Sequence, residues 1–328
     1  MSTAGEAPEL SYIRAVNTAL DEALRTFPEV VVFGEDVALP NGPFGATKGL
    51  HSKYGNRVFD TPISESAMVG TALGAAMGGL RPVVEVMYAD FLLVAMDQIV
   101  NQVANARYVS EGALTAPLVI RTQQGHTPGA CAQHSQSLEA MFAHVPGLRV
   151  AMPATPADAY SMLLESIALD DPVLFIEARA LYPGKGPVPV GEPSPTLGRS
   201  QTVKEGDALT VVTWGTGRRL VTEAVESHPS ASAVEVIDLR WISPWDRDSV
   251  VRSAARTGRL LVVHEANEQA GFGAEVVAEV ACELGGTLRA SRRVGLRGTP
   301  VPSAPTLAQA VLPTVERVSD AITSLLEV

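Results

Sequence analysis

The feature that most constrains this chain is an alternation of short apolar runs with longer segments of helical character. The runs are rich in the β-branched residues that favour strands. In the first half they cover 30–36, 82–88, 117–122, 148–153 and 172–177. Between the second and third, residues 96–108 place apolar side chains on one helical stripe. This alternation predicts an α/β fold with a parallel sheet covered on both faces.

A proline-rich stretch, "YPGKGPVPVGEPSPT" at 182–196, interrupts this pattern. Prolines at this density neither continue a helix nor pair in a central strand. A second alternating series follows, with apolar runs at 209–215, 234–240 and 260–266. We therefore predict two α/β domains, at 1–185 and 200–328, joined by a linker at 186–199. A length of 328 residues agrees with two domains.

Composition excludes several classes of protein. The net charge is −11 and no basic cluster occurs, so nucleic acid is not an expected partner. No apolar run approaches the ~18 residues of a membrane span, and the first residues do not resemble a signal peptide. The two cysteines, Cys131 and Cys282, are far apart and indicate a reducing compartment. We expect a cytoplasmic protein without a cysteine-built metal site.

Glycine patterns give little support to nucleotide binding. Gly70, Gly74 and Gly78 recur every four residues, which indicates close packing against one helix face; a phosphate cradle needs glycines in a loop before a helix. "GFGAEV" at 271–276 begins like a dinucleotide fingerprint but has Val276 in place of the third glycine. The sequence also contains no P-loop, HExxH or GxSxG motif.

One histidine is distinguished by its context. None of the six histidines pairs with another at metal-ligand spacing beside a carboxylate. His134 lies in "GHTPGACAQHSQS", a polar loop that follows a predicted core strand. Loops at the carboxyl ends of parallel strands are where such sheets bind ligands. From the residues alone, a catalytic histidine and a hydrogen-bonded structural histidine remain equal alternatives.

Glu65 lies at the start of a predicted helix of small apolar residues. In "DTPISE", Ser64 is a natural N-cap. The helix dipole favours the ionised carboxylate, whereas burial against the glycine and alanine helix favours the neutral acid. Such a carboxyl group could share a proton with a bound base. The alternative is an ordinary acid in a solvated first helical turn.

Several motifs together resemble a known family. The chain is similar to the beta subunit of the thiamine-diphosphate-dependent 2-oxo acid dehydrogenases, which act on pyruvate, branched-chain 2-oxo acids or, in a related enzyme, acetoin. The matching stretches, in order, are "VVFGEDV", "FDTPISESAMVGTALGAAMGGLRPVVEVMYADF", "DQIVNQVANARY", "PLVIRTQQG", "QHSQSLEAMFAHVPGLRVAMPATPADA", "DPVLFIEARALYP" and "EVIDLRWISPWD". The resemblance implies a pyrimidine-binding domain of the transketolase type followed by a transketolase C-terminal-like domain.

The resemblance also implies roles for four residues. Glu65 would contact the ring nitrogen of the cofactor's aminopyrimidine and share a proton with it. Phe91 would pack on the pyrimidine ring, a contact worth ~0.5–1.5 kcal/mol beyond area burial. His134 would donate a proton during acyl transfer to lipoamide. Glu35 would line a polar tunnel between paired active sites; a structural role in an interface would look the same.

The family's diphosphate-binding signature is missing. Thiamine diphosphate is held through Mg²⁺ by a Gly-Asp-Gly motif, which supplies hard oxygen ligands. No such motif occurs here, and the nearest string, "EGDAL" at 205–209, lacks the second glycine. The resemblance therefore implies an alpha subunit that holds the diphosphate and Mg²⁺, in an alpha-two beta-two heterotetramer with a beta–beta contact. A lipoyl acyltransferase would be a further partner.

Some family members also hold a potassium ion. The resemblance would put it near Leu118 and the stretch from Ser166 to Asp171, with Leu169 and Asp171 in place of an aspartate and an asparagine. Backbone carbonyls could still serve as ligands.

The function implied is oxidative decarboxylation of a branched-chain 2-oxo acid or pyruvate, with transfer of the acyl group to lipoamide. The alternatives are an acetoin dehydrogenase beta subunit, a split transketolase-like carboligase, and a non-catalytic protein that kept the fold. Presence of Glu65, Phe91 and His134 argues against the last. The "QSLEAMFAHVPG" stretch favours the branched-chain and acetoin relatives.

Overall fold

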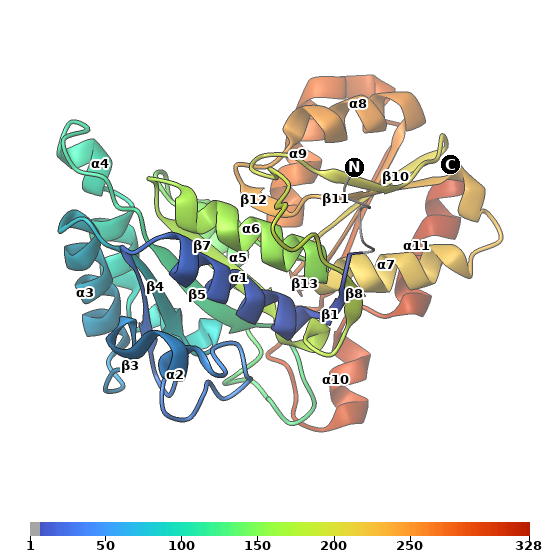
Figure 1. Cartoon of the computed structure of the whole chain (residues 1–328). Helices are drawn as coiled ribbons and strands as arrows, with labels where there is room; N and C mark the ends of the chain where they lie inside the picture. Colours follow the sequence, from blue (N-terminus) through green and yellow to red (C-terminus); the bar gives the residue numbers. More distant parts are fainter. Residues whose placement is uncertain (1–6) are drawn as a thin grey trace, which may run out of the picture. The chain divides into compact units, whose positions relative to one another are not determined.

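The computed structural model of the chain describes residues 7–328. These divide into two compact units, drawn in Figure 1. The first unit comprises residues up to 123, 144–177 and 181–197, and the second comprises 124–143, 178–180 and 198–328. Each unit is described by itself below. The boundaries predicted from the sequence, at 185 and 200, stay a prediction.

A parallel sheet forms the centre of the first unit. Its strands are β2 (Val30–Gly34), β3 (Val58–Asp60), β4 (Arg81–Val86), β5 (Val119–Gln124), β6 (Arg149–Ala151) and β7 (Val173–Ala178). They lie in the order β6-β7-β5-β4-β2-β3, and β2 pairs in parallel with both β3 and β4. All five apolar runs predicted in this region contain a strand. Because strands covered on both faces consist almost entirely of apolar residues, sequence alone identified them.

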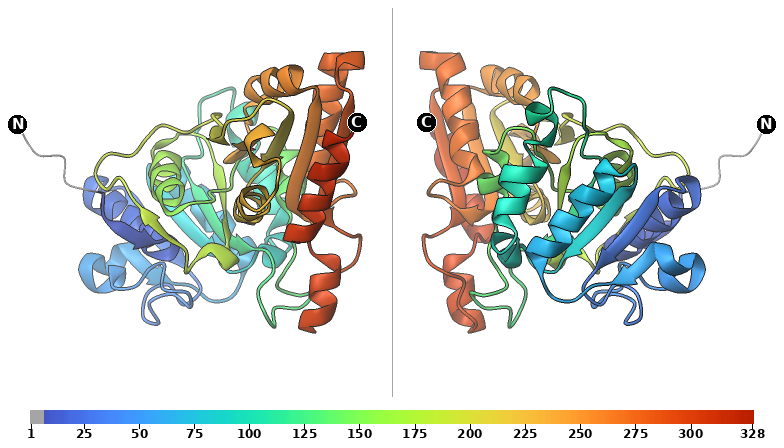
Figure 2. Two further views of the ribbon diagram at one scale, coloured as in Figure 1. Left: turned by 90° about the vertical axis from the view of Figure 1, so that its right-hand side faces the viewer. Right: turned by 90° about the vertical axis from the view of Figure 1, so that its left-hand side faces the viewer.

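Helices cover both faces of this sheet. On one face α1 (Tyr12–Thr26) lies beside α6 (Pro156–Ala168), and on the other α3 (Glu65–Met77) lies beside η3 (Gln98–Val103), as Figures 1 and 2 show. The shorter elements of the unit are β1 (Glu9–Ser11), α2 (Leu50–Tyr54), η1 (Gly55–Arg57), η2 (Ala89–Leu93), α4 (Ala106–Val109) and β8 (Lys185–Pro187). A short helix, η4 (Arg179–Leu181), begins in the second unit and ends in the first.

The prediction of an α-helix over 96–108 is wrong about the type of helix. Residues Gln98–Val103 form a π-helix, in which the Ala104 amide donates to the Ile99 carbonyl five residues back. A separate short helix, α4, follows. Ile99, Val103 and Ala104 are nevertheless buried, as the apolar stripe predicted. A stripe of five positions does not distinguish a period of 3.6 from the wider π turn, which occurs often near functional sites.

Helix α3 is buried on one side only. Met68, Val69 and Ala72 face the interior, whereas the glycine face is open in this chain. A Cβ added at Gly74 would meet nothing within 4 Å, and one at Gly70 would meet only the side chain of Gln98. The close helix packing predicted from the glycine spacing is therefore absent at Gly74 within the described residues.

The second unit has its own sheet, in the order β14-β13-β10-β11-β9. Its elements are α5 (Glu139–Ala143), β9 (Gln201–Lys204), β10 (Leu209–Thr213), α7 (Thr216–Glu226), η5 (Ala231–Ala233), β11 (Val234–Asp238), β12 (Trp241–Ser243), α8 (Arg247–Thr257), β13 (Arg259–Asn267), α9 (Phe272–Leu284), η6 (Gly285–Thr287), β14 (Ala290–Leu296), α10 (Pro305–Val311) and α11 (Val315–Leu326). Helices α7 and α11 pack on one face and α8 and α9 on the other (Figure 1). The three predicted strands of this unit are β10, β11 and β13.

The proline-rich stretch is fastened to the first unit along much of its length. Within it, β8 pairs antiparallel with β1. The Glu165 carboxylate of α6 accepts hydrogen bonds from the Thr196 and Leu197 amides, at 2.9 and 3.2 Å, and from the Thr196 hydroxyl at 2.6 Å. Prolines prevent regular structure here, but other backbone amides of the stretch still find side-chain acceptors.

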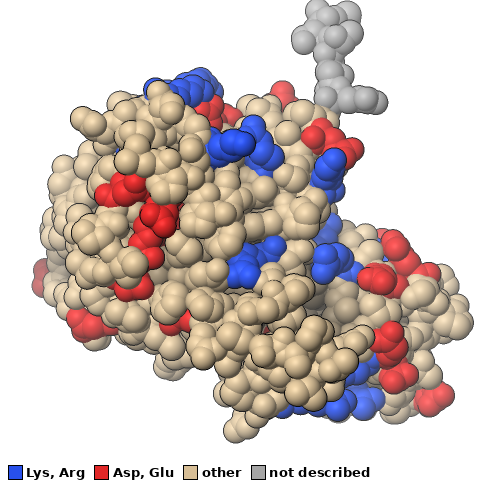
Figure 3. Space-filling view, turned by 90° about the horizontal axis from the view of Figure 1, so that it is seen from below, with Lys and Arg blue, Asp and Glu red and all other residues tan. Residues whose placement is uncertain are grey.

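Charge is dispersed on the face that Figure 3 shows. On the face in Figure 3, Lys and Arg side chains lie in small groups among Asp and Glu side chains and a larger uncharged area. Within residues 7–328, no helix has the length and apolar character that a membrane span requires.

Candidate functional site

Three loops of the first unit begin at the carboxyl ends of the neighbouring strands β3, β2 and β4. Such ends form the ligand-binding edge of a parallel sheet. Gly34, the last residue of β2, lies opposite Glu85 of β4. A Cβ at Gly34 would approach the Glu85 carbonyl oxygen to 2.5 Å, so only glycine fits there. The Gly34 carbonyl accepts a hydrogen bond from the Thr61 amide at 2.9 Å, which ties the loop that leads to Glu65 to this strand.

Glu65 opens helix α3 and is only 7% exposed. Ser64 occupies the N-cap position as predicted, but its side chain makes no capping hydrogen bond. The next residue, Ser66, donates instead to the Val94 carbonyl at 2.6 Å. The start of the helix is thus fixed against the segment after β4. Glu65 is a buried acid in a first helical turn, so the alternative of a solvated acid does not hold, and a role in proton sharing stays a prediction.

Glu35 lies close to Glu65 and has an unsatisfied oxygen. Its Oε1 is buried and has no hydrogen-bond partner among the described residues. Burial raises the pKa of the Glu35 carboxyl, and the neighbouring carboxylates of Glu65, Asp36 and Glu85 raise it further. A group of acids with an unpaired buried oxygen fits a ligand that brings a proton or a positive charge.

Phe91 belongs to a small aromatic group at the same edge of the sheet. Its ring meets that of Tyr88 edge to face, with centroids 6.2 Å apart, and Tyr88 meets Phe44 in the same manner at 5.9 Å. Phe91 lies in η2, directly after β4, and is partly exposed. An aromatic face at this position can pack on a planar ring.

A second, fully buried group of charges lies deeper in the sheet. Arg121 of β5 is 0% exposed and contacts two carboxylates, Glu85 at 2.7 Å and Glu177 at 2.5 Å. The Tyr182 hydroxyl donates to Glu177 at 2.7 Å, and Gln123 donates to Glu85 at 2.9 Å. Sequence analysis missed this group. In the sequence, the group is visible only as one charged residue inside each of three apolar runs, and these runs form the adjacent strands β4, β5 and β7.

His134 belongs to the second unit, in the loop between β5 and α5. The base of this loop is closed by buried side chains. Gln124 donates to Glu139 at 2.8 Å and accepts from the Leu138 amide at 3.1 Å, while the Trp214 indole donates to Glu139 at 3.1 Å. His134 itself is partly exposed. The loop thus has a fixed base and a partly exposed histidine, and it follows core strand β5 as the sequence predicted.

Glu265 of β13 fastens the beginning of the same loop. Its carboxylate accepts from the His126 amide and from the Thr216 hydroxyl. A Cβ at Gly125 would lie 2.8 Å from the Glu265 carboxylate, so the loop passes it closely only because residue 125 is glycine. Burial raises the pKa of the Glu265 carboxyl. Two cavities adjoin this loop: one of about 190 Å³ reaches His126 and Glu265, and one of about 540 Å³ lies against residues 135–138.

The glycines of "GFGAEV" have a packing role. A Cβ at Gly273 would lie 2.5 Å from Nε2 of His264, and one at Gly271 would lie 2.9 Å from the same ring. His264 is fully buried and stacks on Trp214, with centroids 5.2 Å apart. The two glycines make room for this stacked pair.

The residues that the resemblance implies as potassium ligands already make hydrogen bonds or ion pairs within the chain. The Leu118 carbonyl accepts from the Val173 amide at 3.0 Å, and the Leu169 carbonyl accepts from Arg81 at 2.9 Å. The Ser166 hydroxyl donates to the Met162 carbonyl at 2.6 Å. Asp171 pairs with two arginines. Within residues 7–328, no three histidine, cysteine, aspartate or glutamate side chains are grouped to hold a metal ion.

Comparison with known proteins decides the family. Residues 8–185 match the model of the transketolase pyrimidine binding domain, and residues 198–318 match that of the transketolase C-terminal domain. A beta subunit of acetoin:2,6-dichlorophenolindophenol oxidoreductase from Cupriavidus necator is 39% identical, covering 96% of this chain and 97% of that protein. The chain belongs to the transketolase-type beta-subunit family of the 2-oxo acid dehydrogenases.

Other members of this family are similarly related. The 2-oxoisovalerate dehydrogenase subunit beta of Bacillus subtilis is 36% identical over 97% of this chain and 99% of that protein. The pyruvate dehydrogenase E1 component subunit beta of Acholeplasma laidlawii is 40% identical over 83% of this chain and 84% of that protein. A solved structure titled split gene transketolase, inactive beta4 tetramer, has a TM-score of 0.78 at 24% identity, covering 97% of this chain and 98% of that one. This last likeness concerns the fold alone.

Proposed function

We propose that this chain is the beta subunit of a thiamine-diphosphate-dependent 2-oxo acid dehydrogenase. The observation that carries the proposal is the buried carboxyl of Glu65. Beside it lies Glu35, and the Oε1 atom of Glu35 has no partner among the described residues. When bound, thiamine diphosphate supplies the carbanion chemistry of decarboxylation. Glu65 would hold a proton against the aminopyrimidine nitrogen, and Phe91 would pack on the ring. Glu35 would lend further negative charge at this edge of the sheet.

An alpha subunit would complete the site. The chain contains no Gly-Asp-Gly motif, so the diphosphate and Mg²⁺ would be held by the alpha subunit in an alpha-two beta-two assembly, with a contact between the two beta chains. His134 would act as a proton donor when the acyl group passes to lipoamide on an acyltransferase. Its accessible position on a loop with a fixed base supports that role. We expect the complete enzyme in the cytoplasm.

The substrate we propose is a branched-chain 2-oxo acid or pyruvate. A second candidate is acetoin, because the Cupriavidus relative named for acetoin is 39% identical over almost the whole chain. Relatives named for the other substrates are 36–40% identical, so sequence similarity does not separate the three. A split transketolase-like carboligase is a further alternative.

Reconstitution tests this function. The chain would be co-purified with an alpha subunit of the family and assayed with pyruvate, 3-methyl-2-oxobutanoate and acetoin. His134→Ala should slow acyl transfer to lipoamide far more than decarboxylation measured with an artificial electron acceptor. Equal losses in both assays would remove the proton-donor role. No turnover of any of the three substrates would refute the proposed function.

A further inference from the structure

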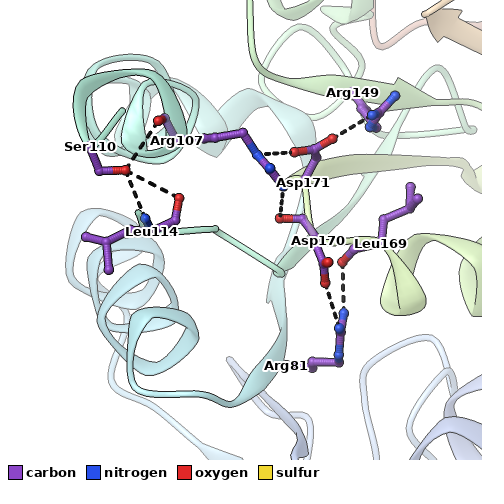
Figure 4. A network of polar contacts seen from close by, with 8 residues as sticks. All are labelled: Arg81, Arg107, Ser110, Leu114, Arg149, Leu169, Asp170 and Asp171. Carbon is purple, nitrogen blue, oxygen red and sulfur yellow. Dashed lines mark hydrogen bonds and ion pairs between the residues drawn. The ribbon is translucent and has the colours of Figure 1, made fainter. Parts of the chain in front are cut away.

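The end of helix α6 is held by an arginine from a neighbouring strand. Arg81, the first residue of β4, donates from Nη1 to the carbonyls of Ile167 and Leu169, at 3.0 and 2.9 Å, and from Nη2 to the Asp170 carboxylate at 2.8 Å. Figure 4 shows its guanidinium pointing at Leu169 and Asp170. The last carbonyls of a helix have no partner within the helix and carry partial negative charge, so a cation there is stabilising.

The next residue of the turn is held by two more arginines. Arg107 lies 2.8 Å from one carboxylate oxygen of Asp171, and Arg149 lies 2.6 Å from the other (Figure 4). Arg107 also donates to the Asp170 carbonyl at 3.4 Å. The turn between α6 and β7 thus has three guanidinium groups directed at its carbonyl and carboxylate oxygens.

This arrangement does not fit a bound monovalent cation. Such an ion needs several oxygen atoms free to face it, whereas here the Leu169 carbonyl and both Asp171 carboxylate oxygens face guanidinium groups. N–H donors cannot ligate a cation, and the guanidinium groups already hold the oxygens that an ion would need. The charges are also balanced internally, because Glu29 lies 3.8 Å from Arg81, in addition to Asp170 and Asp171.

We propose that the Arg81 guanidinium takes the place of a monovalent metal ion at this turn, and that the chain is folded and stable there without potassium. The hydrogen bonds from Arg81 to the carbonyls of Ile167 and Leu169 provide most of this stabilisation. The pair with Asp170 contributes less, because the Asp170 side chain is 61% exposed and solvent screens the attraction. This proposal concerns the architecture of the first unit and does not depend on the proposed function.

Thermal unfolding of the full-length chain tests it without any assay of activity. Melting would be followed by circular dichroism in KCl, NaCl and choline chloride at equal ionic strength. The wild-type chain should melt at the same temperature in all three. Arg81→Ala should melt roughly 5 °C lower in choline chloride, since it leaves two partly buried carbonyls without their arginine donor. Potassium should restore part of that loss, because the freed carbonyls of Ile167 and Leu169 can then accept an ion.

The control is Arg247→Ala in the second unit, which removes an arginine bonded to Glu279 and Glu283 but to no carbonyl. Its melting should be insensitive to the choice of cation. A wild-type chain stabilised by potassium over choline would overturn the proposal. So would an Arg81→Ala variant that is destabilised and does not respond to potassium, since Arg81 would then be only a helix cap. If Arg81→Ala does not fold, the wild-type comparison decides the question.

Discussion

Two groups of acidic side chains in the first unit differ in what neutralises them. Glu85 and Glu177 are buried around Arg121, with Tyr182 and Gln123 bonded to their remaining oxygens. Glu35 and Glu65 lie at the strand ends nearby, and Glu35 keeps a buried oxygen without a partner among the described residues. Glu85 and Glu177 lie inside strands β4 and β7, whereas Glu35 follows β2 and Glu65 begins helix α3.

The difference teaches how a structural acid is distinguished from a binding one. A buried charge must be paired or must change its protonation, because its transfer from water is costly. The Glu85 and Glu177 pair meets this requirement within the chain. In the other pair, one buried oxygen of Glu35 has no partner among the described residues, and burial raises the pKa of that carboxyl. The unpaired group is therefore the better candidate for ligand binding.

Removal of Arg121, the cation shared by Glu85 and Glu177, should have the largest effect on stability. Arg121→Ala leaves two buried carboxylates unpaired and should lower the free energy of unfolding by about 3–5 kcal/mol. Denaturant titration of the full-length chain would measure it. Adding Glu177→Gln to this variant should restore part of the stability, because one of the two unpaired charges is removed. A loss below about 1 kcal/mol would mean that the group is not a structural charge network.

Glu65→Gln should affect activity and leave stability nearly unchanged. It keeps the size and hydrogen-bonding atoms of Glu65 but cannot share a proton, so cofactor activation should slow by ~10²–10⁴. Exchange of the cofactor's thiazolium proton for deuterium, in the enzyme reconstituted with its alpha subunit, would measure this. Wild-type exchange rates would refute the assignment. Loss of assembly would instead point to a role at the start of helix α3.

Tyr182→Phe tests one bond of the paired group. It removes the hydroxyl that donates to Glu177 and keeps the ring that contacts Tyr12 and Phe44. Since a hydrogen bond to a charged group is worth about 1.5–3 kcal/mol, the free energy of unfolding should fall by that amount. Urea unfolding would give the value. An unchanged midpoint would show that Arg121 alone neutralises Glu177.

Glu35→Gln should produce the smallest effect, and of opposite sign. The pKa of Glu35 is raised in the folded chain, so ionisation of this group is unfavourable there. Its contribution to stability is therefore greatest at acid pH and is lost as pH rises from the ordinary glutamate pKa of about 4.3 through the folded value. At pH 7 the variant should be slightly more stable, by less than about 1 kcal/mol, because solvent screens much of the repulsion at this partly exposed group.

Melting temperatures of wild type and Glu35→Gln, recorded from pH 4 to pH 8, would test this sign. The advantage of the variant should shrink toward the acid end, where the wild-type carboxyl is already protonated. If the variant melts higher than wild type by the same amount at every pH, the unsatisfied hydrogen bonds of Glu35, and not repulsion between carboxylates, make this side chain destabilising.

The fold was largely predictable because its central strands are buried on both faces. Strands β9 and β14 were missed, since Gln201–Lys204 is a partly exposed edge and β14 carries the exposed Arg292. Arg81 contacts residues more than 80 positions away, which no local pattern reveals. Glu35 and Glu65 are likewise separated by 30 positions, and only the order of the strands brings them together. Their proposed roles came from the resemblance to a family, and the unpaired oxygen became visible only in the structure.

The hydrogen bonds of the proline-rich stretch bear on how this protein can be re-engineered. Besides Thr196 and Leu197, the amides of Val188, Gly191 and Ser194 all donate to acceptors in the first unit. A fluorescent domain or new chain termini placed between 188 and 197 would break several of these bonds at once. Stretches that look like spacers by composition are usual choices for insertion, but tolerance depends on how the backbone is bonded. In this protein the stretch is part of the folded body and a poor place to cut.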